Sequence, residues 1–222
     1  MNITFNLQTL PGHTDTIEWL KERLKQPLPG FAAQERMMGR VISSPHIAPE
    51  NARPSAVLCL LFPMNDELHV LLMKRKEDKG AHSGQVSFPG GRYETTDADY
   101  KATALREAQE EVGILSSEVE ILGALTSLYI PVSNFNVYPY VGYAQSRPLY
   151  NLSHNEVSYT IEVPLASLLH ADRKITTDVT SPAVPGIIRQ VKAYKLEDET
   201  IIWGATAMII SELEVILQDY AV

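Results

Sequence analysis

A glycine-rich turn followed by an acidic helix constrains this chain more than any other feature. The stretch over residues 88–114 reads FPGGRYETTDADYKATALREAQEEVGI. Thr96 with Asp99 three residues later is typical of a capping box, and Gly113 is the residue expected where a helix ends in a left-handed cap. Small and apolar residues recur between them at spacings of three and four, which predicts one buried helix face. These residues are Ala98, Ala102, Leu105, Ala108 and Val112.

The same helix would carry three carboxylates on another face. Glu107, Glu110 and Glu111 stand at i, i+3 and i+4, so they lie close together. Such carboxylates repel one another, and water, basic side chains or a hard divalent cation must offset the repulsion. Mg²⁺ takes oxygen ligands and usually keeps places for water and substrate phosphates. A pair of glutamates alone is usually a solvated helix face. Here, however, Arg106 can bind a carboxylate in bidentate fashion, and the two glycines of the turn let backbone approach a ligand.

The stretch resembles the Nudix box, G-x5-E-x7-R-E-U-x-E-E-x-G-U, in which U is an apolar residue. The matching positions are Gly91, Arg106, Glu107, Ala108, Glu110, Glu111, Gly113 and Ile114. The stretch departs from the pattern in two respects. Asp97 stands where the first Glu is expected, and eight residues instead of seven separate it from Arg106. The coenzyme A pyrophosphatase branch of the family is similar in both respects.

Residues before the box also resemble that branch, whose signature is L-L-T-x-R-S-x3-R-x3-G-x3-F-P-G-G. The matches are Leu71, Leu72, Arg75, Gly84, Phe88, Pro89, Gly90 and Gly91. Met73, Lys76 and Gly80 differ, and Gly80 stands where an arginine is expected. The pairs Trp203-Gly204 and Thr206-Ala207 are similar to the C-terminal part of the same branch.

The resemblance implies hydrolysis of a nucleoside diphosphate linked to a further group. Mg²⁺ or Mn²⁺ would be held by Glu107, Glu110 and Glu111, with help from a carbonyl at Gly90 or Gly91. The metal would bind phosphate oxygens and activate a water molecule.

Two further roles follow from the resemblance. Arg106 would orient Glu107 or meet the charge that develops on the phosphate. The general base would be Glu107 or, as in Nudix enzymes that place the base outside the box, Glu156. A surface carboxylate in the loop Ser153–Glu156 is the plain alternative for Glu156.

The branch implies coenzyme A or an acyl derivative as the substrate, cut into 4′-phosphopantetheine and adenosine 3′,5′-bisphosphate. The 3′-phosphate requires local cations, and the nearest in sequence are Arg75, Lys76, Lys79 and His82. His82 can equally be a loop histidine without a role. The substrate contacts that we expect are Arg75, Lys79, His82, Phe88 and Gly90.

Two other functions stay open. One is a hydrolase of ADP-ribose or another nucleoside diphosphate derivative, because the signature arginine is absent at Gly80. The other is a nucleotide-binding sensor without catalysis, although such domains often lose a box glutamate and all three are present here.

Charge and composition limit the classes of partner that this protein is expected to bind. The net charge of -8 and the pI of about 5.3 argue against nucleic acid and anionic membranes as partners. An acidic protein can still bind a pyrophosphate if metal ions neutralise the site. The single cysteine, Cys59, excludes an internal disulfide. Neither a signal peptide nor a run of ~18–20 apolar residues is visible. We therefore expect a cytoplasmic protein with a small-molecule nucleotide substrate, and a homodimer is compatible with this.

The order of elements predicts an α/β fold, a Nudix-type α/β/α sandwich with a mixed sheet. Residues 1–52 read as an extension with one helix, which carries Ile17, Leu20 and Leu24 on one face, and residues 53–222 as the Nudix domain. Strands are expected at 55–62, 67–74, 119–126, 136–144 and 157–163, with a tight turn at Asn65-Asp66. Pro139 suggests an edge strand or a bulge. Residues 173–186 read as a long loop, 187–196 with 200–203 as a hairpin, and 205–219 as a helix.

Overall fold

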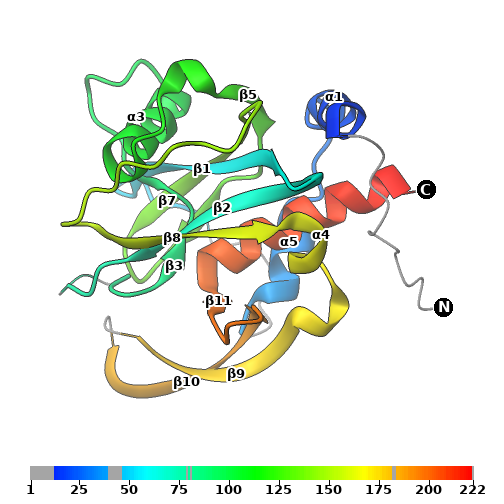
Figure 1. Cartoon of the computed structure of the whole chain (residues 1–222). Coiled ribbons are helices and arrows are strands. Elements are labelled where there is room, and N and C mark those ends of the chain that lie inside the picture. Colours follow the sequence, from blue (N-terminus) through cyan, green and yellow to red (C-terminus); the bar gives the residue numbers. More distant parts are fainter. Residues whose placement is uncertain (1–12, 40–46, 79, 81, 182–183, 222) are drawn as a thin grey trace.

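Strand β1 (Arg53–Met64) lies at the centre of the molecule and faces two cores at once. The computed structural model describes residues 13–39, 47–78, 80, 82–181 and 184–221 (Figure 1). Cys59 and Leu61 of β1 pack into one core, and Leu58 and Leu60 pack into the other. Because successive side chains of a strand point to opposite faces, an uninterrupted apolar strand requires cover on both sides.

The main sheet is built around β1. The strands are β2 (Glu67–Arg75), β3 (Val86–Ser87), β4 (Gly90–Arg92), β5 (Glu120–Ala124), β6 (Leu128–Ile130), β7 (Phe135–Tyr143) and β8 (Val157–Pro164). Its central order is β3-β2-β1-β7-β5, with β8 paired to β2. β1 runs antiparallel to β2 and parallel to β7, so the sheet is mixed, as predicted. The predicted turn is confirmed, since Asn65 and Asp66 have φ angles of 52° and 61°.

Helices cover both faces of this sheet, which confirms the predicted sandwich (Figure 1). Helix α3 (Tyr100–Val112) packs its residues Ala104, Ala108 and Val112 into one core. Helix α5 (Gly204–Gln218) and helix α1 (His13–Arg23) contribute to the other. The short helices are α2 (Phe31–Gln34), η2 (Glu35–Met37), η3 (Ser116–Glu118), α4 (Leu165–Leu168), η4 (Ala171–Arg173) and η5 (Asp219–Ala221).

Helix α3 begins later than the sequence pattern indicates. Asp99 is its N-cap, and its Oδ1 accepts the Ala102 N–H at 2.7 Å, so the predicted capping box at Thr96 is wrong. Ala98 lies before the helix and is exposed, which removes it from the predicted buried face. The end is as predicted, because Gly113 adopts the left-handed conformation with φ 80°.

Pro139 does not lie in an edge strand, in contrast to one of the two expectations from the sequence. Its strand, β7, lies between β1 and β5. The register irregularity lies in the partner strand, between Ile121 and Gly123 of β5. Pro139 lies where the pairing of β7 with β5 gives way to pairing with β6, and its carbonyl accepts the Leu125 N–H at 2.9 Å.

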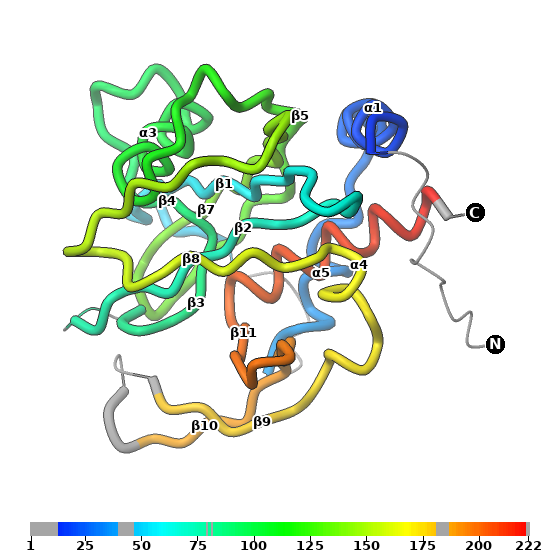
Figure 2. The backbone as a smooth tube through the Cα atoms, in the orientation of Figure 1, coloured from blue at the N-terminus to red at the C-terminus, as the bar shows by residue number. Residues whose placement is uncertain are grey.

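A second sheet replaces the predicted long loop over residues 173–186. Strands β9 (Lys174–Ser181), β10 (Val184–Lys195) and β11 (Ile201–Trp203) form an antiparallel sheet in the order β11-β10-β9. β9 is rich in β-branched residues, which suits a strand. The tube in Figure 2 shows the β9–β10 hairpin running beneath the main sheet. The predicted hairpin over 187–203 is confirmed as β10 and β11.

The segment before β1 packs on α5. Gln34 donates to the buried carboxylate of Glu212 at 3.0 Å, and the Gly30 N–H donates to the same carboxylate at 3.2 Å. Thr126, from the loop after β5, donates its hydroxyl to Glu212 at 2.6 Å. This segment contains α2 and η2 in addition to the predicted helix α1. Within the described residues, none of the helices is long and apolar enough to cross a membrane.

Candidate active site

The two glycines of the turn bring backbone against the acidic helix. Gly90 has a φ of 154°, and a Cβ there would collide with the Ala56 carbonyl. A Cβ on Gly91 would lie 2.5 Å from the carboxylate of Glu107. Position 90 therefore requires glycine for β1–β4 pairing, and glycine at position 91 allows the Glu107 carboxylate to approach the turn.

Glu111 is buried at the centre of this contact. The residue is 2% exposed, and its carboxylate accepts the Gly90 N–H at 2.8 Å and pairs with Nη1 of Arg75 at 3.2 Å. Burial raises the pKa of Glu111 to about 7, although the Gly90 N–H and Arg75 both favour the ionised form. The neighbouring charges of Glu107 and Glu156 raise it further. An ionised Glu111 thus needs more positive charge than Arg75 supplies.

Arg106 binds two carboxylates of the acidic face of α3, the face that carries Glu107, Glu110 and Glu111. Its guanidinium donates to both oxygens of Asp97, at 2.9 and 3.1 Å, and through Nη1 to Glu107 and Glu110, each at 3.0 Å. It also donates to the Arg92 carbonyl at 2.9 Å. Arg106 holds the pKa of Asp97 down to about 2. Asp97 therefore anchors Arg106, and only the unusual spacing of the box pointed to it in the sequence.

Glu107 and Glu110 differ in their surroundings. Glu107 is half-buried, and burial raises its pKa against the opposing effect of Arg106. The Glu110 side chain is 57% exposed. Within the described residues, no three Asp, Glu, His or Cys side chains already surround one point. Glu107 and Glu111 both lie against the Gly90–Gly91 turn, whereas Glu110 is largely exposed.

The donor set still fits a hard divalent cation. Carboxylate oxygens are the ligands that Mg²⁺ and Mn²⁺ prefer. Glu107 and Glu111 are carboxylates whose pKa values are raised by burial and by the charges of neighbouring carboxylates. A cation between them would offset both effects, and Glu110 would join if it exchanged Arg106 for the metal.

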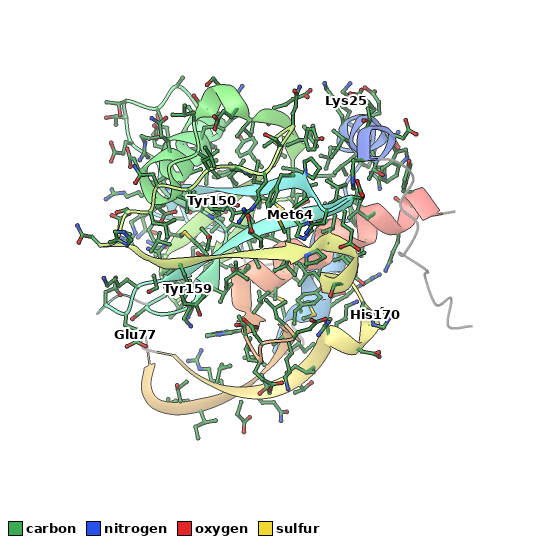
Figure 3. The ribbon with its side chains drawn as sticks, in the orientation of Figure 1. Lys25, Met64, Glu77, Tyr150, Tyr159 and His170 are labelled. Carbon is green, nitrogen blue, oxygen red and sulfur yellow. The ribbon has the colours of Figure 1, made fainter. Side chains whose placement is uncertain are left out.

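Glu156 reaches the acidic face through a loop that docks on the end of α3. The Asn151 and Ser153 N–H groups donate to the carbonyls of Val112 and Glu111, at 3.0 and 2.9 Å. Tyr150, labelled in Figure 3, begins this loop and donates its hydroxyl to Glu162 at 2.7 Å. The loop brings the charge of Glu156 close enough to raise the pKa of both Glu107 and Glu111.

Lys76 ties this loop to the end of β2. Its N–H donates to the Glu156 carbonyl at 2.8 Å, and its Nζ donates to the His154 carbonyl at 2.7 Å. Lys76 stands where the branch signature has serine. The sequence alone did not show that this lysine binds the loop of Glu156.

The expected cluster of cations for a 3′-phosphate is only partly assembled. Arg75 faces Glu111 instead of a remote phosphate. His82 is half-buried, lies 3.1 Å from Oε1 of Gln85, and has its pKa lowered by burial, so it is neutral at pH 7. Lys79 lies outside the described residues. Phe88 is 2% exposed and packs in the core, so its side chain does not line the site.

Comparisons with known proteins identify the family of this chain. A family model for the NUDIX domain matches residues 52–178. The uncharacterized Nudix hydrolase NudL of Shigella flexneri serotype 5b (strain 8401) is 37% identical over 169 residues, which cover 74% of this chain and 83% of that protein. NudL of Escherichia coli O1:K1 / APEC is 37% identical over 167 residues, or 73% and 82% of the two chains.

A solved structure shares the fold. The MutT/nudix family protein from Enterococcus faecalis aligns with a TM-score of 0.51 and 15% identity, over 95% of this chain and 76% of that one. This likeness concerns the fold alone. The match to the domain model covers more than half of the chain, and the relatives exceed 30% identity over most of both lengths. The chain therefore belongs to the Nudix family.

Proposed function

We propose that this Nudix hydrolase cleaves the pyrophosphate bond of coenzyme A or its acyl derivatives, giving 4′-phosphopantetheine and adenosine 3′,5′-bisphosphate. One observation carries the hydrolase part of the proposal. Glu111 is buried beside Glu107 at the Gly90–Gly91 turn, and the pKa values of both are raised. Proteins usually bind Mg²⁺ through one or two carboxylates together with phosphate oxygens of the substrate. Two carboxylates placed in this way are therefore typical of a metal-dependent phosphate site.

The residues that would hold Mg²⁺ or Mn²⁺ are Glu107, Glu110, Glu111 and the carbonyl of Gly91. When bound, the metal supplies positive charge to the phosphate oxygens and activates water. Without that charge, an acidic protein would repel the substrate.

The remaining roles fall to side chains of this chain. Arg106, anchored by Asp97, holds Glu107 in position. Glu156 would accept the proton of the attacking water at its carboxylate, with Glu107 as the other candidate base. Arg75, beside Glu111, would meet the pyrophosphate oxygens, and the Gly90 turn would hold the substrate close to backbone.

Sequence features support coenzyme A within this class. The signature residues Leu71, Leu72, Arg75 and Gly84 and the Phe88–Gly91 turn match the coenzyme A branch, as does the spacing between Asp97 and Arg106. The alternatives are an ADP-ribose or other nucleoside diphosphate hydrolase, and a sensor. We also propose that residues 1–52 form an extension and residues 53–222 the Nudix domain, in a monomer or a homodimer.

The test is kcat/KM for coenzyme A, dephospho-coenzyme A and ADP-ribose, measured side by side with Mg²⁺. Coenzyme A should be preferred. A charge-assisted contact to the 3′-phosphate would make dephospho-coenzyme A roughly 10–150-fold poorer. Lys79→Ala should narrow that gap, and His82→Ala should leave it unchanged because His82 is neutral. A preference for ADP-ribose would favour the first alternative, and binding without hydrolysis would favour the sensor.

A further inference from the structure

A groove lies on the other side of the main sheet from the candidate active site. Its volume is about 430 Å³, within the range of small-molecule sites. One wall comes from the end of β2 and the loop before β3, the loop in which Figure 3 labels Glu77, and the other from β9 and β11. The residues that carry the argument are Lys74, Ser83, Gln85, Thr180, Thr200 and Trp203. We call it the Lys74–Trp203 groove.

The groove and the acidic face share the end of β2. Arg75 points to α3, where it pairs with Glu111. Because neighbouring side chains of a strand point to opposite faces, Lys74 lies on the other face and lines the groove. The loop after β2 borders both places, since Lys76 contacts the loop of Glu156 while Ser83 lines the groove. The groove and the candidate active site therefore lie on opposite faces of the same strand end.

The walls of the groove are joined to each other. Thr206, at the start of α5, donates its hydroxyl to the Val86 carbonyl at 3.0 Å, and this hydrogen bond is buried. Val86 and Trp203 both line the groove, from stretches more than a hundred residues apart. The wall next to β3 and the wall next to α5 are thus held at a fixed separation.

The charge of the groove does not suit a phosphate. Lys74 is its cation, and Asp178 and Glu199 are its carboxylates. Glu199 is paired with Lys195 at 2.6 Å, which leaves Lys74 and Asp178 in balance. A dianionic phosphate would gain little from Lys74 and would be repelled by Asp178. The end of coenzyme A that carries the 3′-phosphate therefore does not belong here.

The remaining chemistry suits a neutral chain with amide groups. Ser83, Gln85, Thr180 and Thr200 supply hydroxyl and amide groups, and Val179 and Trp203 supply apolar surface. A pantetheine arm has two amides and a hydroxyl on an aliphatic chain, so it matches both kinds of surface. We infer that the Lys74–Trp203 groove binds the pantetheine arm of the substrate. This inference rests on the proposed function and names the part of coenzyme A that the groove selects.

The experiment fills the groove and uses a matched control on the same strand. Thr180 and Thr176 are both exposed threonines of β9 that pair with β10, but only Thr180 lines the groove. Thr180→Trp should raise KM for coenzyme A by about tenfold, the equivalent of about two lost hydrogen bonds, with kcat unchanged. Thr176→Trp should leave KM unchanged. Circular dichroism and Tm of both variants monitor folding.

Two further measurements identify which end of the substrate is affected. Thr180→Trp should raise KM for dephospho-coenzyme A by the same factor, because both substrates carry the arm. Free pantetheine should inhibit the wild type competitively, and its inhibition constant should rise about tenfold in Thr180→Trp.

Three results would overturn the inference, and they are distinguishable. If the wild type hydrolyses coenzyme A and Thr180→Trp has the same KM, the groove does not bind the arm, while the proposed function stands. If KM rises but pantetheine inhibits both proteins equally, the adenosine end occupies the groove. If the wild type does not hydrolyse coenzyme A with Mg²⁺ or Mn²⁺, the proposed function fails and the inference fails with it.

Discussion

Arg106 and Asp97 face each other through two hydrogen bonds, Nε to Oδ1 at 2.9 Å and Nη2 to Oδ2 at 3.1 Å. The same guanidinium reaches Glu107 and Glu110 through Nη1. Asp97 is buried and also accepts the Thr103 hydroxyl at 2.9 Å. The arginine is thus held on the helix side of the site, and the position of Glu107 depends on a carboxylate ten positions before it.

Asp97→Asn should show that this pair stabilises the fold in a pH-dependent way. Arg106 lowers the pKa of Asp97 from 3.8 to about 2, so its contribution is complete above pH 4 and is lost as the pH falls towards 2. Urea unfolding at pH 6 and at pH 2.5 should show a large difference between wild type and variant at pH 6 and a much smaller one at pH 2.5. Asp99→Asn, which keeps a capping side chain at the start of α3, is the control. An equal difference at both pH values would contradict this role.

Glu111→Gln should separate activity from stability. Activity should fall by orders of magnitude, since a buried metal ligand and its charge are lost. In the metal-free wild type, the pKa of about 7 means that stability falls as pH rises from about 4.5 to 7, because the folded state binds more protons than the unfolded state.

The glutamine variant has no such titration at this position. Its free energy of unfolding relative to wild type should therefore improve between pH 5 and pH 8, by on the order of 3 kcal/mol. Added Mg²⁺ should remove the pH-dependent loss in the wild type and have no such effect on the variant. Near-wild-type turnover of Glu111→Gln at saturating Mg²⁺ would refute the metal site.

Glu156→Gln and Glu107→Gln should act through different parameters. If Glu156 is the general base, its loss lowers kcat by ~10²–10⁴-fold with metal affinity unchanged. Loss of Glu107 should weaken metal binding as well. Titration of Mn²⁺ by electron paramagnetic resonance, alongside kcat, measures both quantities. A silent Glu156→Gln would return the role of base to Glu107 or to metal-activated water.

Replacing Gly90 by alanine should mainly reduce stability, whereas replacing Gly91 by alanine should mainly reduce activity. Gly90→Ala places a Cβ against the backbone of Ala56 at a φ of 154°, so it should destabilise the fold by about 1–3 kcal/mol or more. Gly91→Ala places a Cβ against the side chain of Glu107, which can move. It should keep most of the stability and lose activity. Tm and kcat/KM of the two variants test this, and equal losses of both kinds would contradict it.

The sequence predicted the local features of this molecule well. Helix α3 with its glycine cap at Gly113, the turn at Asn65-Asp66 and the apolar strand β1 all depend on residues close together in the chain. The start of α3 was missed because Thr96 and Asp99 are both good capping residues, and only the folded loop, in which Asp97 turns back to Arg106, selects between them.

What the sequence could not show depends on distant partners. Residues 173–186 contain prolines and a glycine, which favour a loop, yet pairing with β10 makes β9 a strand. The sequence around Pro139 predicts an edge strand or a bulge. The structure differs because β1, β5 and β6, which come from other parts of the chain, all pair with β7. The ionised or neutral state of His82 depends on its burial beside Gln85, which no local pattern reports. The Lys76 contact with the loop of Glu156 also joins segments far apart in the chain.

The buried carboxylate of Glu212 makes the part of the chain that contains it dependent on the segment before β1. A shortened chain beginning at Ala52 would keep the residues that match the family but would lose the Gln34 and Gly30 donors to that carboxylate. Thr126 would then be its remaining partner among the contacts described, and an acid without enough donors in a core is strongly destabilising. The segment before β1 and the rest of the fold should therefore be retained together. A relative that lacks this segment should carry an apolar or neutral residue at this position of its last helix.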